Sequence, residues 1–306
     1  MAAGARDDFP DARVGGLLPR WGERPRIMGV LNATPDSFSG DGLAGDVDAL
    51  VMRALAQVEA GAEVLDIGGE STRPGATPVP VAEESARVVP LIARLVRCVS
   101  VPLSVDTMKP EIADEALARG AVVLNDVSGL RDARLADVAA RHGAWLVLTH
   151  NGWSARVAHD RLGGYYPETT GHDVLDVVIA DLLALARLAL ARGVAEDRLI
   201  VDPGLGFGKA PRESLELLKR SAELRERLAP YPLLVGPSRK SFVGRALGLP
   251  VEERLEGTLA CVALAAAAGV ELIRVHDVAP CVRAARMAWA VRGGRQAVLP
   301  PPARDA

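Results

Sequence analysis

Polar and charged side chains follow eight short apolar runs of the sequence, and these residues have the types that permit chemistry. Four of them supply hydrogen-bond acceptors and donors: Asp106, Asn125, Asp202 and Lys240. A buried carboxylate that faces a ring N–H and an amino group makes paired, charge-assisted hydrogen bonds. We therefore expect this set to bind the edge of a flat heterocycle that carries N–H, NH2 and C=O groups.

A second group of residues has the properties of an anion site. Arg274 and His276 come at the end of the eighth apolar run, and a helix expected to begin near Asp277 would add the N–H groups of its first turn. Arg73 and Asn32 are candidates to complete an anion site or a metal–anion site. Displacement of a pyrophosphate leaving group fits this inventory, because it needs charge stabilisation and positioning more than covalent help. The sequence offers no Ser-His-Asp arrangement, thiol nucleophile or His-rich metal cage.

One glycine-rich motif has to be set aside. Gly204, Gly206 and Gly208 precede Lys209 in a pattern that resembles a phosphate-binding loop. That motif requires Ser or Thr after the lysine, and this chain has Ala210 there. The glycines therefore give no evidence for a nucleotide-binding loop.

The candidate residues follow short β-branched runs, which alternate with longer helical patterns from Arg26 onward. The expected strands cover residues 27–31, 64–67, 103–105, 122–124, 145–148, 199–201, 233–235 and 272–275. The clearest helical stretches cover residues 47–60, 83–99, 110–119, 174–192, 213–228 and 252–268. Because the strands are continuous apolar runs and do not alternate with polar residues, both faces of the sheet are expected to be buried, as in a parallel sheet.

Eight strand–helix units in about 270 residues predict a closed (β/α)8 TIM barrel of the α/β class, whose active site forms at the carboxyl ends of the strands. An open, doubly wound sheet is the structural alternative. We expect a single barrel domain at residues 25–292, between an N-terminal tail at 1–24 and a C-terminal tail at 293–306. Residues 151–172 are expected to form an unusually long loop after the fifth strand, and long loops in compact domains are often functional.

Composition narrows the class of partner. The chain has 306 residues, a formal net charge of −3 and 49% hydrophobic residues, which gives no support for nucleic acid or a membrane surface as the main partner. Its three cysteines are far apart and form no CxxC pair, so they indicate neither a disulfide framework nor a zinc cluster, and they are expected to be small buried hydrophobic residues. No signal peptide is recognised, and a cytoplasmic location is expected.

Seven segments, in order, resemble the signature segments of the dihydropteroate synthases. They are GVLNATPDSFSGDG, DIGGESTRPG, LSVDT, LNDVSG, VDPGLGFGK, GPSRKSFVG and GTLA…RVHDV. The resemblance runs from about Arg26 to Arg292, nearly the whole chain. It implies a pterin-binding TIM barrel that condenses 6-hydroxymethyl-7,8-dihydropterin diphosphate with p-aminobenzoate, releasing pyrophosphate and 7,8-dihydropteroate in folate biosynthesis.

The resemblance also implies roles for individual residues. The pterin ring would be held by Asp106, Asn125, Asp202, Phe207 and Lys240, and the pyrophosphate by Asn32, Arg274 and His276. Asn32 would also contact a Mg2+ ion. Residues bordering the p-aminobenzoate pocket, where sulfonamides compete, would be Phe38, Thr72, Pro74 and Ser241, while Asp36, Arg73 and Lys240 would be catalytic, the first two by ordering mobile loops over the site. The family also implies a homodimer.

The chain departs from the family after the fifth strand, where Thr149, His150 and Asn151 replace a Met-His-Met-like sequence. The loss of a methionine near the pterin leaves open a non-catalytic paralogue that binds pterin only. A methyltetrahydrofolate–corrinoid methyltransferase, which shares a pterin-binding barrel, is the alternative from another reaction class. The STRPG and SRKSF segments and the retained charged residues favour the synthase over both.

Overall fold

The computed structural model describes residues 22–34, 43–71, 76–152, 166–168 and 171–293. Most of the two expected tails and of the expected long loop lies outside these residues. Within the described residues, no helix combines the length and apolar character needed to cross a membrane.

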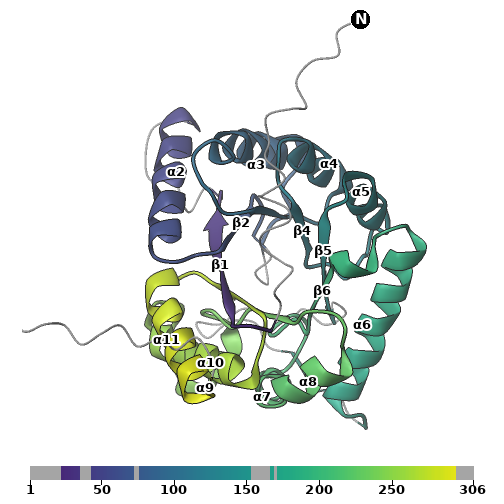
Figure 1. Ribbon diagram of the computed structural model, residues 1–306, viewed down its shortest axis with the longest axis vertical. Coiled ribbons are helices and arrows are strands. Elements are labelled where there is room, and N and C mark those ends of the chain that lie inside the picture. Colours follow the sequence, from purple (N-terminus) through teal and green to yellow (C-terminus); the bar gives the residue numbers. More distant parts are fainter. Residues whose placement is uncertain (1–21, 35–42, 72–75, 153–165, 169–170, 294–306) are drawn as a thin grey trace, which may run out of the picture.

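Eight parallel strands form the centre of the molecule (Figure 1). They are β1 (Arg26–Asn32), β2 (Val64–Gly68), β3 (Leu103–Asp106), β4 (Val123–Asp126), β5 (Trp145–Thr149), β6 (Leu199–Asp202), β7 (Leu234–Val235) and β8 (Leu272–Val275). Their order in the sheet is β6-β5-β4-β3-β2-β1-β8-β7, and a parallel bridge between Val201 and Leu233 joins the two ends. This closure confirms the predicted TIM barrel and excludes the open sheet.

Helices surround the strands as an outer ring (Figure 1). They are α2 (Leu43–Glu59), α3 (Val81–Leu95), α4 (Pro110–Ala118), α5 (Arg134–His142), α6 (Val174–Ala191), α7 (Pro211–Lys219), α8 (Ser221–Arg227), α9 (Ser241–Leu247), α10 (Leu255–Ala268) and α11 (Val278–Val291). The prediction of a single helix at 213–228 was wrong, because α7 and α8 are separated at Arg220. The hydroxyl of Ser221 donates to the carbonyl of Leu218, and such local bonds compete with the regular helix ladder.

The core has two parts. The larger part lies between the strands and the helices, and the smaller part consists of inward-facing strand residues: Met28, Val64, Val123, Trp145, Val147, Ile200, Leu234 and Leu272. This second cluster fills the barrel interior with side chains, as in other TIM barrels. Cys261 and Cys281 are buried as expected, whereas Cys98 is exposed because it lies in the turn after α3.

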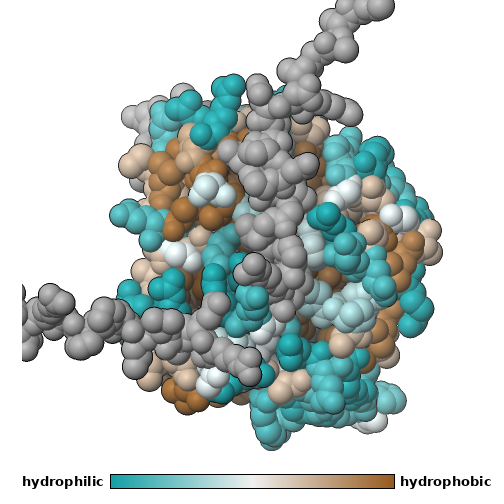
Figure 2. Space-filling view, in the orientation of Figure 1, coloured by the Kyte–Doolittle hydropathy of each residue, from teal (hydrophilic) through white to brown (hydrophobic). Residues whose placement is uncertain are grey.

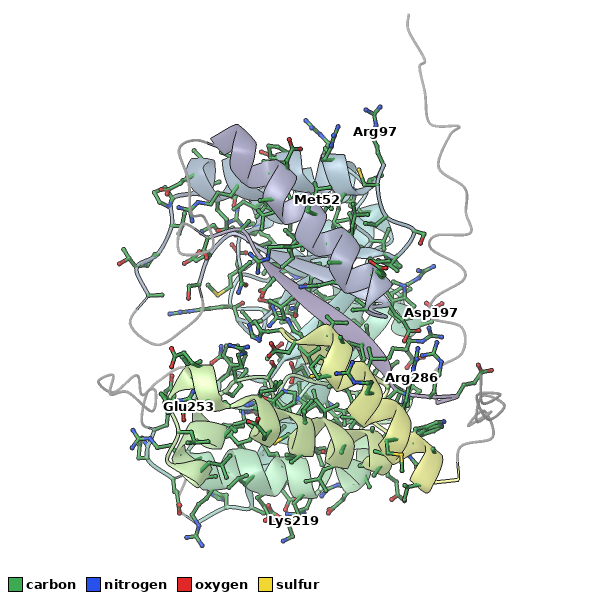
Figure 3. The ribbon with its side chains drawn as sticks, turned by 90° about the vertical axis from the view of Figure 1, so that its left-hand side faces the viewer. Met52, Arg97, Asp197, Lys219, Glu253 and Arg286 are labelled. Carbon is green, nitrogen blue, oxygen red and sulfur yellow. The ribbon has the colours of Figure 1, made fainter. Side chains whose placement is uncertain are left out.

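The two ends of the barrel are distinct in the side view (Figure 3). Asp197 lies in the turn before β6 and therefore labels the amino end of the strands, whereas Glu253, between α9 and α10, lies at the opposite end. The outer surface mixes polar and apolar residues, with an apolar area over α2 (Figure 2). Met52 of α2 is 65% exposed.

Candidate functional site

A layer of polar side chains lies just above the apolar cluster inside the barrel. Side chains two residues apart on a strand share one face. Asp66, Asn125, Asp202 and Arg274 each follow a member of the apolar cluster by two residues, namely Val64, Val123, Ile200 and Leu272. The chain therefore places its charged interior residues toward the carboxyl ends of the strands, where TIM barrels carry their active sites.

Neighbouring strands bring these residues together. In the sheet register Asp106 of β3 pairs with Asn125 of β4, and Asp202 of β6 pairs with Thr149 of β5. Arg274 reaches across from β8, since its Nη2 donates to Asp106 Oδ2 at 2.6 Å. The structure thus gathers the predicted ring-binding residues and the predicted anion-binding arginine into one cluster.

The cluster also includes Asp66, which the sequence analysis did not select. The Nε of Arg274 donates to Asp66 Oδ2 at 2.6 Å, and the Nδ2 of Asn125 donates to the same oxygen at 2.9 Å. Asp66 is fully buried on β2. The signal that marks it in the sequence is a charged residue inside an apolar strand.

Burial perturbs the carboxyl groups of this layer. It raises the pKa of Asp106 to about 7; the positive charge of Arg274 opposes this rise, and the negative charge of Asp66 adds to it. Burial also raises the pKa of Asp202, against the opposing charge of Lys240. Strongly perturbed acids at the carboxyl end of a barrel are typical of functional sites.

Lys240 lies on the other side of the cluster, at the start of α9. Its Nζ donates to the carbonyl of Leu205 at 2.7 Å and lies 3.8 Å from the centre of the Phe207 ring. Burial lowers the pKa of Lys240 to about 8, and the nearby charge of Asp202 limits the fall. An ammonium, an aromatic ring and a carboxylate therefore lie together beside the β6 loop.

The glycine-rich segment after β6 forms a tightly packed loop. Gly204 has φ +66°, and a Cβ there would lie 2.0 Å from the carbonyl oxygen of His150. The buried ammonium of Lys209 donates to the carbonyls of Gly204 at 3.0 Å and Phe207 at 3.2 Å. The lysine of the apparent phosphate motif therefore holds its own loop together, a role that the sequence analysis missed.

Lys209 also connects the loop to β5 and α6. Its Nζ lies 2.8 Å from Nδ1 of His150, whose Nε2 lies 3.1 Å from Asp181 Oδ2. Burial lowers the pKa of Lys209 to about 7, with Asp202 opposing, and lowers that of His150 to about 4, with Lys209 contributing. A neutral His150 that accepts from Lys209 and donates to Asp181 satisfies all three groups.

His276 lies two residues beyond Arg274. Its backbone N–H donates to the hydroxyl of Ser238 at 3.1 Å, and its Nδ1 lies 3.0 Å from the same oxygen. Helix α11 begins at Val278, as expected, and Asp277 accepts two hydrogen bonds from Arg239, at 2.8 Å and 2.7 Å. The turn after β7 and the turn after β8 are therefore joined at the barrel mouth.

Two of the remaining predicted residues lie in the described part of the chain and five do not. Asn32 ends β1 beside Gly68 and is partly buried, and Ser241 is the partly buried first residue of α9. The others lie outside the described residues: Asp36, Phe38, Thr72, Arg73 and Pro74. Among the described residues, no three or more His, Cys, Asp or Glu side chains are grouped to hold a metal ion by themselves.

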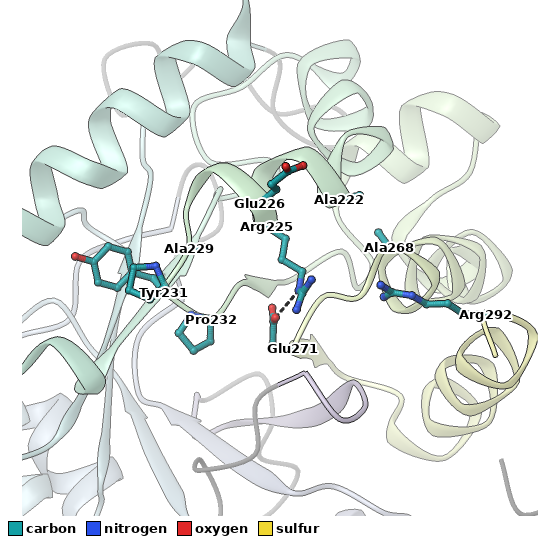
Figure 4. A pocket seen from close by; sticks show the side chains of 10 residues that line it. Ala222, Arg225, Glu226, Ala229, Tyr231, Pro232, Ala268, Glu271 and Arg292 are labelled. Carbon is teal, nitrogen blue, oxygen red and sulfur yellow. Dashed lines mark hydrogen bonds and ion pairs between the residues drawn. The ribbon is translucent and has the colours of Figure 1, made fainter. Parts of the chain in front are cut away.

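A cavity of about 520 Å³ lies at the other end of the barrel (Figure 4). Its lining includes Arg225, Tyr231, Glu271 and Arg292, and Arg225 pairs with Glu271 just before β8. The amino end of a TIM barrel generally serves stability. This cavity is therefore separate from the polar layer.

The closed barrel, the perturbed acids and the buried ammonium are typical of a TIM-barrel enzyme with a polar site at the carboxyl ends of its strands. Comparison with known proteins identifies the family. A family model described as pterin binding enzyme matches residues 28–276. The dihydropteroate synthase of Bacillus subtilis (strain 168) is 42% identical over 266 residues, covering 87% of this chain and 88% of that protein.

Solved structures agree. A Xanthomonas albilineans dihydropteroate synthase with 4-aminobenzoic acid is similar with a TM-score of 0.79 and 42% identity, covering 89% of this chain and 94% of that one. A complex of the enzyme from the same organism with 7,8-dihydropteroate gives a TM-score of 0.78 and 39% identity, covering 92% and 98%. The chain belongs to the family of pterin-binding enzymes that includes the dihydropteroate synthases.

Proposed function

We propose that this chain catalyses the condensation of 6-hydroxymethyl-7,8-dihydropterin diphosphate with p-aminobenzoate. The observation that carries the proposal is a single cluster of polar side chains. In it Arg274 bonds to Asp106, and the charges of Asp202 and Lys240 each act on the pKa of the other. Relatives named dihydropteroate synthase, and neighbours solved with 4-aminobenzoic acid or 7,8-dihydropteroate, support the choice of substrates.

In this proposal the polar layer binds the pterin ring. Asp106 and Asp202 accept from ring N–H and amino groups, Asn125 adds an amide, and Lys240 donates to a ring acceptor. The Phe207 ring lies under the Lys240 ammonium and helps to keep it in place. Buried carboxylates and an ammonium in fixed positions make the site selective for its ligand. A ligand that lacks the matching donors and acceptor leaves these buried groups unpaired.

The diphosphate is assigned to Asn32, Arg274 and His276, near the first turn of α11. A Mg2+ ion fits the oxygen ligand that Asn32 offers, because Mg2+ commonly takes one or two protein oxygens and completes its shell with water and phosphate. When bound, the ion would neutralise charge on the leaving group. Arg274 would add a fixed positive charge on the same side.

The reaction begins when the C–O bond between the pterin methylene and the diphosphate breaks, and the electron pair leaves with pyrophosphate. The aromatic amine then attacks the cationic methylene, a C–N bond forms, and the amine gives its proton to solvent. The buried carboxylates Asp106 and Asp202 place negative charge beside the developing pterin cation. Orientation of the two substrates supplies the rest of the acceleration.

The second substrate is assigned by the family resemblance alone. By that resemblance, Phe38, Thr72, Pro74 and Ser241 would border the p-aminobenzoate pocket, and Asp36 and Arg73 would order the loops that close over the site. Homodimer formation and a cytoplasmic location are proposed on the same ground, and sedimentation of the purified chain tests the first.

The test is incubation of the full chain with the pterin diphosphate, p-aminobenzoate and Mg2+, followed by assay of pyrophosphate and dihydropteroate. We expect both products in equal amounts, and a loss of turnover on addition of EDTA. Asp202→Asn should lower turnover strongly, whereas Asp197→Asn, exposed at the amino end (Figure 3), serves as the matched control. Pterin binding with no pyrophosphate release would contradict the synthase and favour a paralogue that only binds pterin.

A further inference from the structure

Asp66 occupies the centre of the polar layer. It is fully buried on β2, where the register places it between Val30 of β1 and Ser104 of β3. Its Oδ2 accepts from Asn125 at 2.9 Å and from Arg274 at 2.6 Å. Its Oδ1 is buried and has no partner among the described residues. One carboxylate therefore contacts a proposed ring-binding residue and a proposed diphosphate-binding residue together.

We propose that Asp66 is a positioning residue, which orients the Asn125 amide and the Arg274 guanidinium toward the pterin diphosphate and so sets the selectivity of the site. The inference deepens the proposed function and rests on it. Asp66 itself is not assigned a contact with the substrate.

The effect on Asn125 follows from the chemistry of an amide. A carboxylate can only accept hydrogen bonds, so Asp66 holds the NH2 end of the amide toward itself. The Oδ1 of Asn125 is then turned away from Asp66 as an acceptor. An amide with this orientation selects a ring edge that presents a donor, and rejects an edge that presents an acceptor.

Asp66 also fixes the plane of the Arg274 guanidinium. Nε bonds to Asp66 and Nη2 bonds to Asp106, both at 2.6 Å, so two carboxylates on neighbouring strands hold the guanidinium from two directions. The guanidinium has five N–H donors, and these two bonds leave three others to meet an anion. Loss of Asp66 would leave the guanidinium with one carboxylate and a freer rotation.

A charge-based measurement distinguishes this role from ordinary packing. The charges that face Asp106 are those of Arg274, Asp66, Glu84, Asp126 and Lys240. The charge of Asp66 raises the pKa of Asp106, so its removal should lower that pKa. If ionised Asp106 binds the pterin, the acidic limb of pterin binding moves to lower pH. The charge of Asp126 raises the same pKa less than the charge of Asp66 does, so Asp126→Asn should move this limb less than Asp66→Asn.

The experiment compares wild type with Asp66→Asn, a change of charge at nearly constant volume. Binding of 6-hydroxymethyl-7,8-dihydropterin is measured by calorimetry from pH 5.5 to 9, and KM is measured for both substrates. We expect pterin affinity at pH 8 to fall about tenfold or more, KM for p-aminobenzoate to stay within about twofold, and the acidic limb to shift downward.

Asp126→Asn is the matched control. Asp126 is also a buried carboxylate, on β4, but among the described residues it accepts hydrogen bonds only from Ser128 and Leu130 in its own turn. This variant should lose stability without the selective loss of pterin affinity. Equal losses of pterin affinity in the two variants, or an unmoved acidic limb in Asp66→Asn, would overturn the proposal.

A second measurement does not depend on the folding of a variant. In a crystal structure of the wild-type chain with a bound pterin, Asn125 Nδ2 and Arg274 Nε should both remain on Asp66. A structure in which the pterin displaces either group would overturn the proposal. Failure of the proposed function is distinguishable from both results, because it appears as absence of dihydropteroate from the wild-type enzyme.

Discussion

Replacement of Lys240 by methionine should separate activity from stability in this barrel. The Lys240 ammonium is buried, bonds to the carbonyl of Leu205 at 2.7 Å and lies 3.8 Å from the Phe207 ring centre. Methionine has a similar length and no charge, so it keeps much of the packing and removes the donor. In the proposed function the activity depends on that donor, whereas the fold has to accommodate its buried charge.

The magnitude follows from the pKa of Lys240, which burial lowers from 10.5 to about 8. This fall corresponds to about 3 kcal/mol against the ammonium in the folded chain. Methionine avoids that penalty, but it loses about 1 kcal/mol from the hydrogen bond and about 1 kcal/mol from the ring contact. We therefore expect the free energy of unfolding at pH 7 to stay within about 1 kcal/mol of wild type, or to rise slightly.

The sign can be checked by varying pH. In wild type the unfolded chain holds the Lys240 proton up to about pH 10.5, whereas the folded chain releases it near pH 8. The contribution of this group to stability therefore improves as pH rises from about 8 to about 10.5. Lys240→Met lacks this gain. The difference in free energy of unfolding between pH 7 and pH 10, measured by urea titration, should therefore be smaller in the variant than in wild type.

Activity should change far more than stability. Loss of a charge-assisted hydrogen bond in the transition state costs roughly 2–4 kcal/mol, or about 30- to 1000-fold in kcat/KM for the pterin diphosphate. Lys219→Met is the control, because the Lys219 side chain is 75% exposed on the outer surface (Figure 3). The reasoning would be refuted by wild-type kcat/KM in Lys240→Met, or by a loss of stability above about 3 kcal/mol.

Three further predictions concern the same mouth. Lys209→Met should lower the free energy of unfolding by about 2–4 kcal/mol, because four acceptors lose their donor and this cost exceeds the relief of the ammonium's burial penalty; an unchanged denaturation midpoint would contradict this. Gly204→Ala should cost about 3 kcal/mol, because φ is +66° and the new Cβ meets a backbone carbonyl at 2.0 Å; an unaltered Tm argues against that packing. Pterin affinity should fall as pH drops below about 7, since Asp106 becomes protonated, and Asp106→Asn should abolish this dependence in calorimetry.

The sequence predicted the barrel and the polar residues that end its strands, because both depend on local patterns. Asp106, Asn125 and Asp202 end apolar runs, and parallel strands bring such ends to one edge. Asp66 is not predicted by this pattern, because it lies inside a run whose other residues are apolar. On the inward face of the strands, an apolar side chain is followed two residues later by a polar one. Only the closed structure shows that these residues form an apolar layer and a polar layer inside the barrel.

The role of Lys209 could not be predicted for a different reason. Its partner His150 is 59 residues away, and their contact depends on how the loop after β6 folds back on the end of β5. The glycines indicate a tight loop, but they do not indicate which of its carbonyls accept hydrogen bonds from Lys209. The break between α7 and α8 likewise depends on side-chain bonds that compete with an otherwise continuous helical pattern.

Burial makes the charged forms of the polar layer electrostatically unfavourable, and in the proposed function this cost contributes to ligand selectivity. Burial drives the pKa of Asp106 up to about 7 and that of Lys240 down to about 8, so both groups are pushed toward their neutral forms. A ligand that donates to the carboxylate and accepts from the ammonium stabilises the charged forms instead. If the pterin binds as proposed, part of its binding free energy comes from relief of this cost, which a ring without the matching donor and acceptor cannot supply. The charges that reduce the stability of the barrel would then also give it selectivity.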